Sequence, residues 1–269
     1  MNIRKDLNNN MWEKELQAAI EAANLAKKAI LDFYHTKVEV EIKSDDSPVT
    51  IADKTADKII REYLHEKFPT HAFLTEESED NGDRLQNDFV WIVDPVDGTK
   101  DFIAHDDEFT TNIALAYKHK LVVGVVLAPA CDELYYASAG NGAFFQKGEQ
   151  KPVKIHVSDK VSDLTVLISV FHFNDNEKLM IEKHSDKLKH VVRRGSSLKP
   201  CMIAHGLAEV HYRFSGNTKE WDTAACQIVV EEAGGLFVEP DGTPITYNRE
   251  DVYNRNGYIV VNRKENILL

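Results

Sequence analysis

Two aspartates that directly follow an apolar run are the residues of this chain best suited to chemistry. The segment from Phe89 to Phe102 reads FVWIVDPVDGTKDF, and it carries Asp94 and Asp97. Carboxylate oxygens are the ligands that Mg²⁺ and Ca²⁺ prefer. The other interpretation is a turn whose acids accept hydrogen bonds from the following backbone. An EF-hand is disfavoured, because its loop needs alternating ligands and a distal glutamate that this segment lacks.

The residues around these acids predict how they are positioned. The apolar run over 89–93 predicts a buried central strand, and Pro95 cannot donate to a sheet ladder, so we expect the strand to stop at Asp94. Gly98 allows a tight turn or a close approach to a ligand. After it we expect a helix or turn whose free N–H groups face the site. The sequence thus predicts that one rigid turn carries both carboxylates.

Three other acids lie in informative places. Glu76 follows a short apolar strand in FLTEESED, and we interpret the acids after it as a solvated loop: Glu77, Glu79 and Asp80. Asp53 falls in the first turn of a predicted helix, where an acid stabilises the helix dipole. Asp222 begins a predicted helix in EWDTAACQIVVEEAGG and would serve there as an N-cap. The small pair Ala224–Ala225 would let that helix pack closely against whatever Asp222 faces.

Composition excludes several classes of protein. The chain has 269 residues, of which 43% are hydrophobic, and its net charge is −12 without a basic run, which argues against binding a nucleic-acid polymer. We expect no signal peptide and no transmembrane segment. The three cysteines form no CxxC pair, which fits a reducing compartment: Cys131, Cys201 and Cys226. We therefore expect a cytoplasmic protein, and peripheral association with a membrane stays open.

Hydrophobic periodicity predicts an α/β protein with two halves. Residues 1–155 should form an α+β half with helices over 12–34 and 50–68. An antiparallel meander should follow, with strands over 89–93, 109–118, 121–128, 133–138 and 143–147. Residues 156–269 should form an α/β half with a mixed sheet. Its strands are expected near 164–170, 190–194, 208–214, 235–239 and 258–262, and its helices near 176–186, 196–205 and 222–233.

Several of these segments together resemble a known family. EES, WIVDPVDGTKDF and WDTAACQIVVEEAGG are similar to signature segments of the inositol monophosphatase-like, lithium-sensitive, magnesium-dependent phosphatases. The resemblance runs from SPVTIADK at 47–54 to AGG at 233–235, and it implies a layered αβαβα sandwich. SPVTIADK, DGTKDF, EFTTNIAL, GSSLKPCMIAHGLAEVHYRF and WDTAA resemble the CysQ-type 3′(2′),5′-bisphosphate nucleotidases more closely. Inositol monophosphatases usually have Asn where Asp101 stands and lack GSSLK.

The resemblance implies roles for particular residues. Two or three Mg²⁺ ions would be held by Glu76, Asp94, Asp97, Asp222 and the carbonyl of Val96. Asp53 and Thr99 would hydrogen-bond each other and orient the attacking water. Substrate contacts would come from Gly98, Thr99, Ser196, Ser197, Lys199 and Asp222. The Ser–Lys turn would meet a second phosphate.

The implied activity is hydrolysis of the 3′-phosphate of 3′-phosphoadenosine 5′-phosphate to AMP and phosphate, by in-line attack of a metal-activated water. The 5′-phosphosulfate analogue is a further candidate substrate. The partner is therefore a small phosphorylated nucleotide, and the protein is expected to be a monomer or homodimer. An inositol monophosphatase, a fructose-1,6-bisphosphatase and a non-catalytic nucleotide or metal sensor are the alternatives.

The contacts that set specificity stay open. RFSGNTKEWD is one residue longer than the RFGPTxxWD pattern of the nucleotidases, which leaves the adenine pocket undefined. Three arginines are either charge clamps or solvated edge residues: Arg193, Arg194 and Arg213. Lys43 has a family counterpart near the active site, but it is equally a lone exposed lysine.

Overall fold

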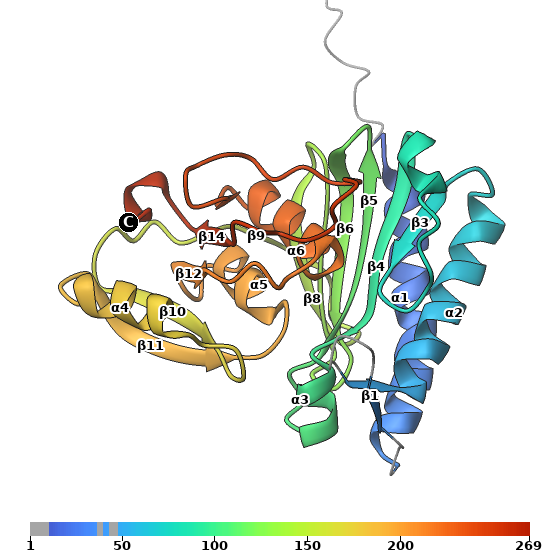
Figure 1. Ribbon diagram of the computed structural model, residues 1–269, viewed down its shortest axis with the longest axis horizontal. Coiled ribbons are helices and arrows are strands. Elements are labelled where there is room, and N and C mark those ends of the chain that lie inside the picture. The colour runs from blue at the N-terminus through green and yellow to red at the C-terminus, as the bar shows by residue number, and fades with distance from the viewer. Residues whose placement is uncertain (1–10, 37–39, 43–47) are drawn as a thin grey trace, which may run out of the picture.

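The computed structural model describes residues 11–36, 40–42 and 48–269 (Figure 1). Two long amphipathic helices, α1 (Glu13–Tyr34) and α2 (Ile51–Lys67), pack together on one face of a large sheet. The buried stripe of α1 is rich in alanine, which lets the helix lie close to its neighbours: Ala18, Ala19, Ala22, Ala23 and Ala26. Both helices agree with the prediction from periodicity. Lys43 lies outside the described residues.

The large sheet has seven strands in the order β3-β4-β5-β6-β7-β8-β9. Its strands are β3 (Ala72–Thr75), β4 (Phe89–Asp97), β5 (Thr110–Tyr117), β6 (Lys120–Ala128), β7 (Glu133–Ser138), β8 (Gly142–Lys147) and β9 (Val153–Ile155). β3 pairs with β4 in parallel, and the strands from β4 to β9 form the predicted antiparallel meander. The sequence did not predict β9 or the small hairpin of β1 (Val40–Ile42) and β2 (Pro48–Thr50).

The second sheet has five strands in the order β11-β10-β12-β14-β13. The elements of this half are β10 (Leu164–Ser169), α4 (Asp175–Lys183), β11 (Leu188–Arg194), α5 (Leu198–Ala204), β12 (Val210–Arg213), α6 (Glu220–Glu232), β13 (Leu236–Val238) and β14 (Tyr258–Val261). β10 is parallel to β11 and β12, whereas β14 is antiparallel to its neighbours. The sheet is mixed, as predicted. Short 3₁₀ turns complete the described elements at Asp83–Gln86 and Lys264–Asn266.

The elements stack into five layers, which confirms the αβαβα sandwich (Figure 1). α5 and α6 lie between the two sheets, with α1 and α2 outside the first sheet and α4 outside the second. One buried cluster includes Val126 of β6, Ile228 of α6 and Val260 of β14, so the two halves share a core. The contact is close: a Cβ on Gly124 of β6 would lie 2.3 Å from Ile228 Cγ2. The last strand of the first sheet along the chain ends at Ile155, and the strands that follow belong to the second sheet.

The expectation that β4 stops at its first carboxylate was wrong. The strand runs on to Asp97, because a bulge absorbs the proline. Asp94 pairs with Asn112 and Asp97 pairs with Thr110, so two residues of β4 face Thr111 alone. The Thr111 hydroxyl donates to the Pro95 carbonyl at 2.9 Å. The bulge therefore sets both aspartates on the end of a paired strand rather than on a free turn.

Candidate active site

A cleft of about 500 Å³ lies at the junction of the two halves. It is lined by the end of β4, the short helix α3 (Thr99–Ala104), the start of α5, the end of β12 and the start of α6. Every residue to which the resemblance assigned a metal-binding, catalytic or substrate-binding role, except Asp53, lines this cleft. The cleft therefore brings together residues that are far apart in the chain.

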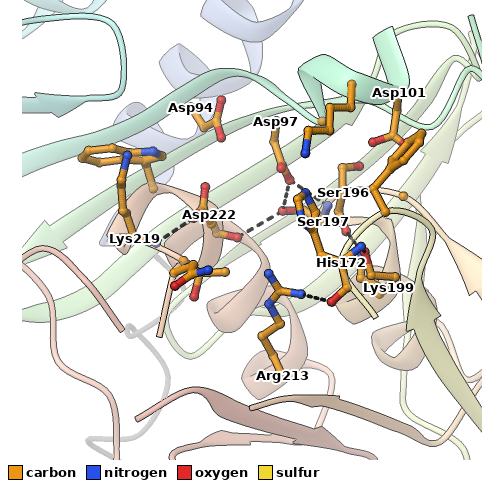
Figure 2. A pocket seen from close by; sticks show the side chains of 18 of the residues that line it. Asp94, Asp97, Asp101, His172, Ser196, Ser197, Lys199, Arg213, Lys219 and Asp222 are labelled. Atoms are coloured by element: carbon orange, nitrogen blue, oxygen red, sulfur yellow. Dashed lines mark hydrogen bonds between the residues drawn. The ribbon is translucent and has the colours of Figure 1, made fainter. Parts of the chain in front are cut away.

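Three carboxylates form the centre of the cleft (Figure 2). One oxygen each from Asp94, Asp97 and Asp222 lie within 4.8 Å of one another. Glu76 also lines the cleft, and its backbone N–H donates to the carbonyl of Val93 at 3.1 Å, which continues the β3–β4 pairing. The parallel ladder thus places Glu76 next to the aspartates of β4.

The electrostatics of the cluster favour a bound cation. Burial, followed by repulsion from Glu76, Asp97 and Asp222, raises the pKa of Asp94 well above its usual value. Burial, then repulsion from Asp97 and Glu76, raises the pKa of Asp222 to about 8. Such repulsion is relieved when a divalent ion neutralises the carboxylates. The groups that could bind a cation here offer oxygen atoms, which fits Mg²⁺ and disfavours metals that prefer nitrogen or sulfur.

Asp97 is held in a single orientation by residues from both halves. Its Oδ2 accepts the Ser197 N–H at 2.8 Å and the Ser197 hydroxyl at 2.7 Å. Asn112 Nδ2 donates to the same oxygen at 3.2 Å, and Thr110 Oγ1 lies 3.3 Å away. These contacts leave Oδ1 for a cation. Asn112 lies in the segment EFTTNIAL, but its type and position had predicted no role for it.

Asp53 lies behind the cleft and contacts Thr99. Thr99 Oγ1 lies 3.1 Å from Asp53 Oδ1, so the hydrogen bond that the resemblance implied is present. The other oxygen of Asp53 accepts the Thr50 N–H at 2.8 Å and the Thr50 hydroxyl at 2.6 Å. Asp53 is therefore also part of the capping box of α2, and the two interpretations are compatible.

Asp222 does not cap its helix in the way the sequence suggested. α6 begins at Glu220, and Asp222 Oδ2 accepts the backbone N–H of Lys219 at 2.6 Å. Asp222 is the third helical residue, a position from which an acid bonds back to the start of the helix. The helix starts earlier because Glu220 is itself buried and accepts the N–H groups of Asn248 and Arg249.

The Ser–Lys turn lines the cleft beside Asp97 (Figure 2). The Ser196 hydroxyl donates to the Glu108 carbonyl at 2.6 Å. Lys199 is 7% exposed, and its ammonium donates to the carbonyls of Ser196 at 2.6 Å and Arg194 at 3.2 Å. Burial lowers the pKa of Lys199, and nearby Asp97 opposes that effect. These two bonds use two of the three N–H groups of the Lys199 ammonium.

Only one of the three arginines lines the cleft. Arg213 is buried and donates to the His172 carbonyl at 2.7 Å (Figure 2). Arg194 pairs with Glu108 at 3.5 Å, and Arg193 lies over the Phe173 ring. The longer segment RFSGNTKEWD also reaches the cleft, through Asn217, Thr218 and Lys219, next to Tyr253. The sequence predicted no role for His172 or Tyr253, which line the cleft but lie outside the segments that resemble the family.

Comparison with known proteins now places the chain. The model of the inositol monophosphatase family matches residues 11–268. The chain belongs to the inositol monophosphatase family. Its curated relatives include the 3′(2′),5′-bisphosphate nucleotidase CysQ of Buchnera aphidicola, which is 36% identical over 90% of this chain and 91% of the relative. The CysQ of Escherichia coli K12 is also 36% identical, over 91% of this chain and 98% of the relative.

Solved structures agree with this placement in the inositol monophosphatase family. CysQ from Bacteroides thetaiotaomicron superposes with a TM-score of 0.83 and 33% identity, covering 95% of this chain and 100% of that one. SuhB from Bartonella henselae superposes with a TM-score of 0.78 and 28% identity, covering 94% and 98%. The resemblance noted from the motifs is confirmed.

Within the described residues, no helix is long and apolar enough to span a bilayer.

Proposed function

We propose that this member of the inositol monophosphatase family is a Mg²⁺-dependent 3′(2′),5′-bisphosphate nucleotidase. Its substrate is 3′-phosphoadenosine 5′-phosphate, which it converts to AMP and phosphate, with the 5′-phosphosulfate analogue as a second candidate. The observation that carries the proposal is the convergence of Asp94, Asp97 and Asp222 within 4.8 Å, beside the Thr99–Asp53 hydrogen bond. The CysQ relatives bear this activity in their names, which supports the choice of substrate.

The metal ligands are proposed as two or three sites built from carboxylates and one carbonyl. They are Glu76, Asp94, Asp97, Asp222 and the carbonyl of Val96, all of which line the cleft. Bound Mg²⁺ supplies Lewis acidity, which activates water for attack on phosphorus and offsets the charge that develops on the leaving oxygen. Asn112 and Ser197 keep Asp97 in place for this purpose.

The protein's own groups position the water and the substrate. Asp53 accepts the hydroxyl hydrogen of Thr99, so the Thr99 oxygen is left to accept a hydrogen bond from water that attacks in line with the leaving group. The backbone N–H groups of Gly98 and Thr99 bind the phosphate that is hydrolysed. Asp222 contacts the substrate beside this phosphate as well as the metal.

The second phosphate of the substrate is assigned to the Ser–Lys turn. Lys199 supplies a positive charge and Ser196 supplies polar atoms at the cleft wall. The Ser197 hydroxyl already donates to Asp97, so Ser197 contributes by holding the turn against the metal cluster. Arg213 adds a second cation to this wall.

A panel of substrates tests the proposal. The purified protein is assayed with 3′-phosphoadenosine 5′-phosphate, its 5′-phosphosulfate analogue, inositol 1-phosphate and fructose 1,6-bisphosphate, each with Mg²⁺ and with excess chelator. We expect the highest kcat/KM for a bisphosphate nucleotide. With excess chelator we expect no turnover of any of the four compounds. A preference for inositol phosphate or the sugar bisphosphate would reassign the substrate. Binding of nucleotide without turnover of any of the four would identify a sensor.

A further inference from the structure

Glu108 joins the two halves of the protein next to the cleft. It lies between α3 and β5 in the N-terminal half, and its contacts are with the turn that precedes α5 in the C-terminal half. Its Oε2 accepts the N–H of Gly195 at 2.6 Å, and its backbone carbonyl accepts the Ser196 hydroxyl at 2.6 Å. Its Oε1 lies 3.5 Å from Arg194 Nη1. One residue thus contacts three successive residues of the turn.

The turn has a conformation that it would not keep unaided. Ser196 has a φ of +38°, a region that disfavours residues with a side chain. Gly195 has no room for a side chain, since a Cβ would lie 2.6 Å from Asp101 Oδ1 and 2.8 Å from the Glu108 carbonyl oxygen. Unfavourable backbone geometry of this kind persists only where surrounding contacts hold it.

The contacts that hold the turn come from both of its sides. Glu108 takes the Gly195 N–H and Asp97 takes the Ser197 N–H, so two carboxylates of the N-terminal half bind alternate amides of one turn. On the inner side the Lys199 ammonium donates to the Ser196 carbonyl. Truncation of the Glu108 side chain leaves the Asp97 contact to Ser197 and the bond from the Ser196 hydroxyl to the Glu108 backbone carbonyl in place. It removes the acceptor of the Gly195 N–H and the partner of Arg194, directly before Ser196.

We propose that Glu108 is a positioning residue for the second phosphate of the substrate. It acts through Gly195 and Ser196, whose fixed conformation presents Ser196 and the Lys199 ammonium to the cleft. The inference rests on the proposed function. Through this turn, Glu108 would support the preference of the enzyme for substrates with two separate phosphate groups over substrates with one.

The test compares two substrates that differ only in the second phosphate. These are 3′-phosphoadenosine 5′-phosphate and adenosine 3′-monophosphate, and the measured quantity is the ratio of their kcat/KM values. In Glu108→Ala we expect this ratio to fall about 10-fold or more, because the charge-assisted hydrogen bond that holds the Gly195 N–H is lost. The loss should lie mainly in KM for the bisphosphate. Glu108→Gln keeps an acceptor for Gly195 and should restore part of the ratio.

Two further variants make the test decisive. Gly195→Ala forces a Cβ against the Glu108 carbonyl and should lower the ratio as Glu108→Ala does. Glu149→Ala removes the same charge from an exposed turn between β8 and β9 and should keep the wild-type ratio. Wild-type ratios in both Glu108→Ala and Gly195→Ala, measured on folded protein, would overturn the role of Glu108 alone. Wild-type protein that fails to hydrolyse the bisphosphate would overturn the proposed function as well.

Discussion

Thr99 Oγ1 lies 3.1 Å from Asp53 Oδ1, and this bond joins the first residue of α3 to the first turn of α2. Two donors of Thr50 occupy the other oxygen of Asp53, and the carboxylate is 1% exposed. Asp53 therefore has one oxygen available, and Thr99 uses it. Thr99 Oγ1 also lies 3.3 Å from the Val96 carbonyl oxygen, so the hydroxyl at the edge of the cleft has two acceptors, of which Asp53 is the nearer.

The pair should act as one catalytic unit. Thr99→Val removes the hydroxyl that orients water, and Asp53→Asn weakens its acceptor, so each should lower kcat by about 10²–10⁴-fold. The double variant should lose little beyond either single one, because residues that act together are not additive. Single-turnover rates and Mg²⁺ titrations of the three variants check this. Losses that multiply, or an Asp53→Asn variant that loses only thermal stability, would leave Asp53 as a helix-capping acid.

The carboxylate cluster should be necessary for turnover and dispensable for folding. Asp94→Asn removes a ligand charge from the end of β4, and we expect almost no activity at any Mg²⁺ concentration with a native circular dichroism spectrum. Calorimetry should show weaker Mg²⁺ binding in parallel. Asp88→Asn, at an exposed acid just before β4, serves as the control and should behave as the wild type. Equal turnover of the wild type in excess chelator would exclude the metal mechanism.

Lithium should inhibit the enzyme at millimolar concentrations or below, as the family resemblance implies. A small monovalent ion can occupy a Mg²⁺ position without supplying the same charge, so the local electrostatics that the reaction needs are lost. Initial rates measured against LiCl, with NaCl at equal ionic strength as the control, give the comparison. Full activity in high LiCl would count against the proposed arrangement of metal sites.

Stability should fall in mild acid because of His211. Burial, with the nearby charge of Lys199, lowers the pKa of this histidine to about 3, and its Nδ1 lies 2.9 Å from the Leu167 carbonyl oxygen. The unfolded chain takes up a proton near pH 6.5, so the stability that neutral His211 contributes is complete above that pH and is lost as the pH falls toward 3. From pH 7 to pH 5 the loss is about 2 kcal/mol.

Chemical denaturation at several pH values measures this loss. His211→Asn keeps a donor for the Leu167 carbonyl and does not titrate, so its free energy of unfolding should vary less between pH 7 and pH 5 than that of the wild type. The comparison concerns the slope and not the absolute stability, which the smaller side chain also changes. Parallel slopes for the two proteins would show that His211 is already solvated in the folded state.

Periodicity was enough to predict most helices and strands, because amphipathic stripes such as that of α1 depend on local sequence alone. The course of β4 was not predictable in this way. Whether a proline ends a strand or enters a bulge depends on the partner strand, and here Thr111 of β5 accommodates Pro95. The start of α6 was missed for a similar reason, since buried Glu220 bonds to residues from 248 onward.

The residues of the site likewise differ in whether the local sequence could predict them. Asp94 and Asp97 are neighbours in the chain, so their convergence followed from sequence, whereas Asp222 joined them only through the family resemblance. Glu108 opens the segment EFTTNIAL, which resembles the nucleotidases, but its role was not predictable. Its partner Gly195 is distant in sequence and contributes a backbone N–H that any residue except proline could offer. Contacts between side chains and backbone across two halves need the fold before they can be found.

The position of α6 between the two sheets limits how this enzyme can move. A helix that packs against Gly124 of one sheet and shares a core with β14 of the other ties the two halves together, so a hinge between them would have to open that core. We therefore expect Asp222, in the first turn of α6, to keep its spacing from Asp94 and Asp97 when substrate binds. We expect product release to need only exchange of water and small rearrangements at the mouth of the cleft, and not a large opening between the two halves.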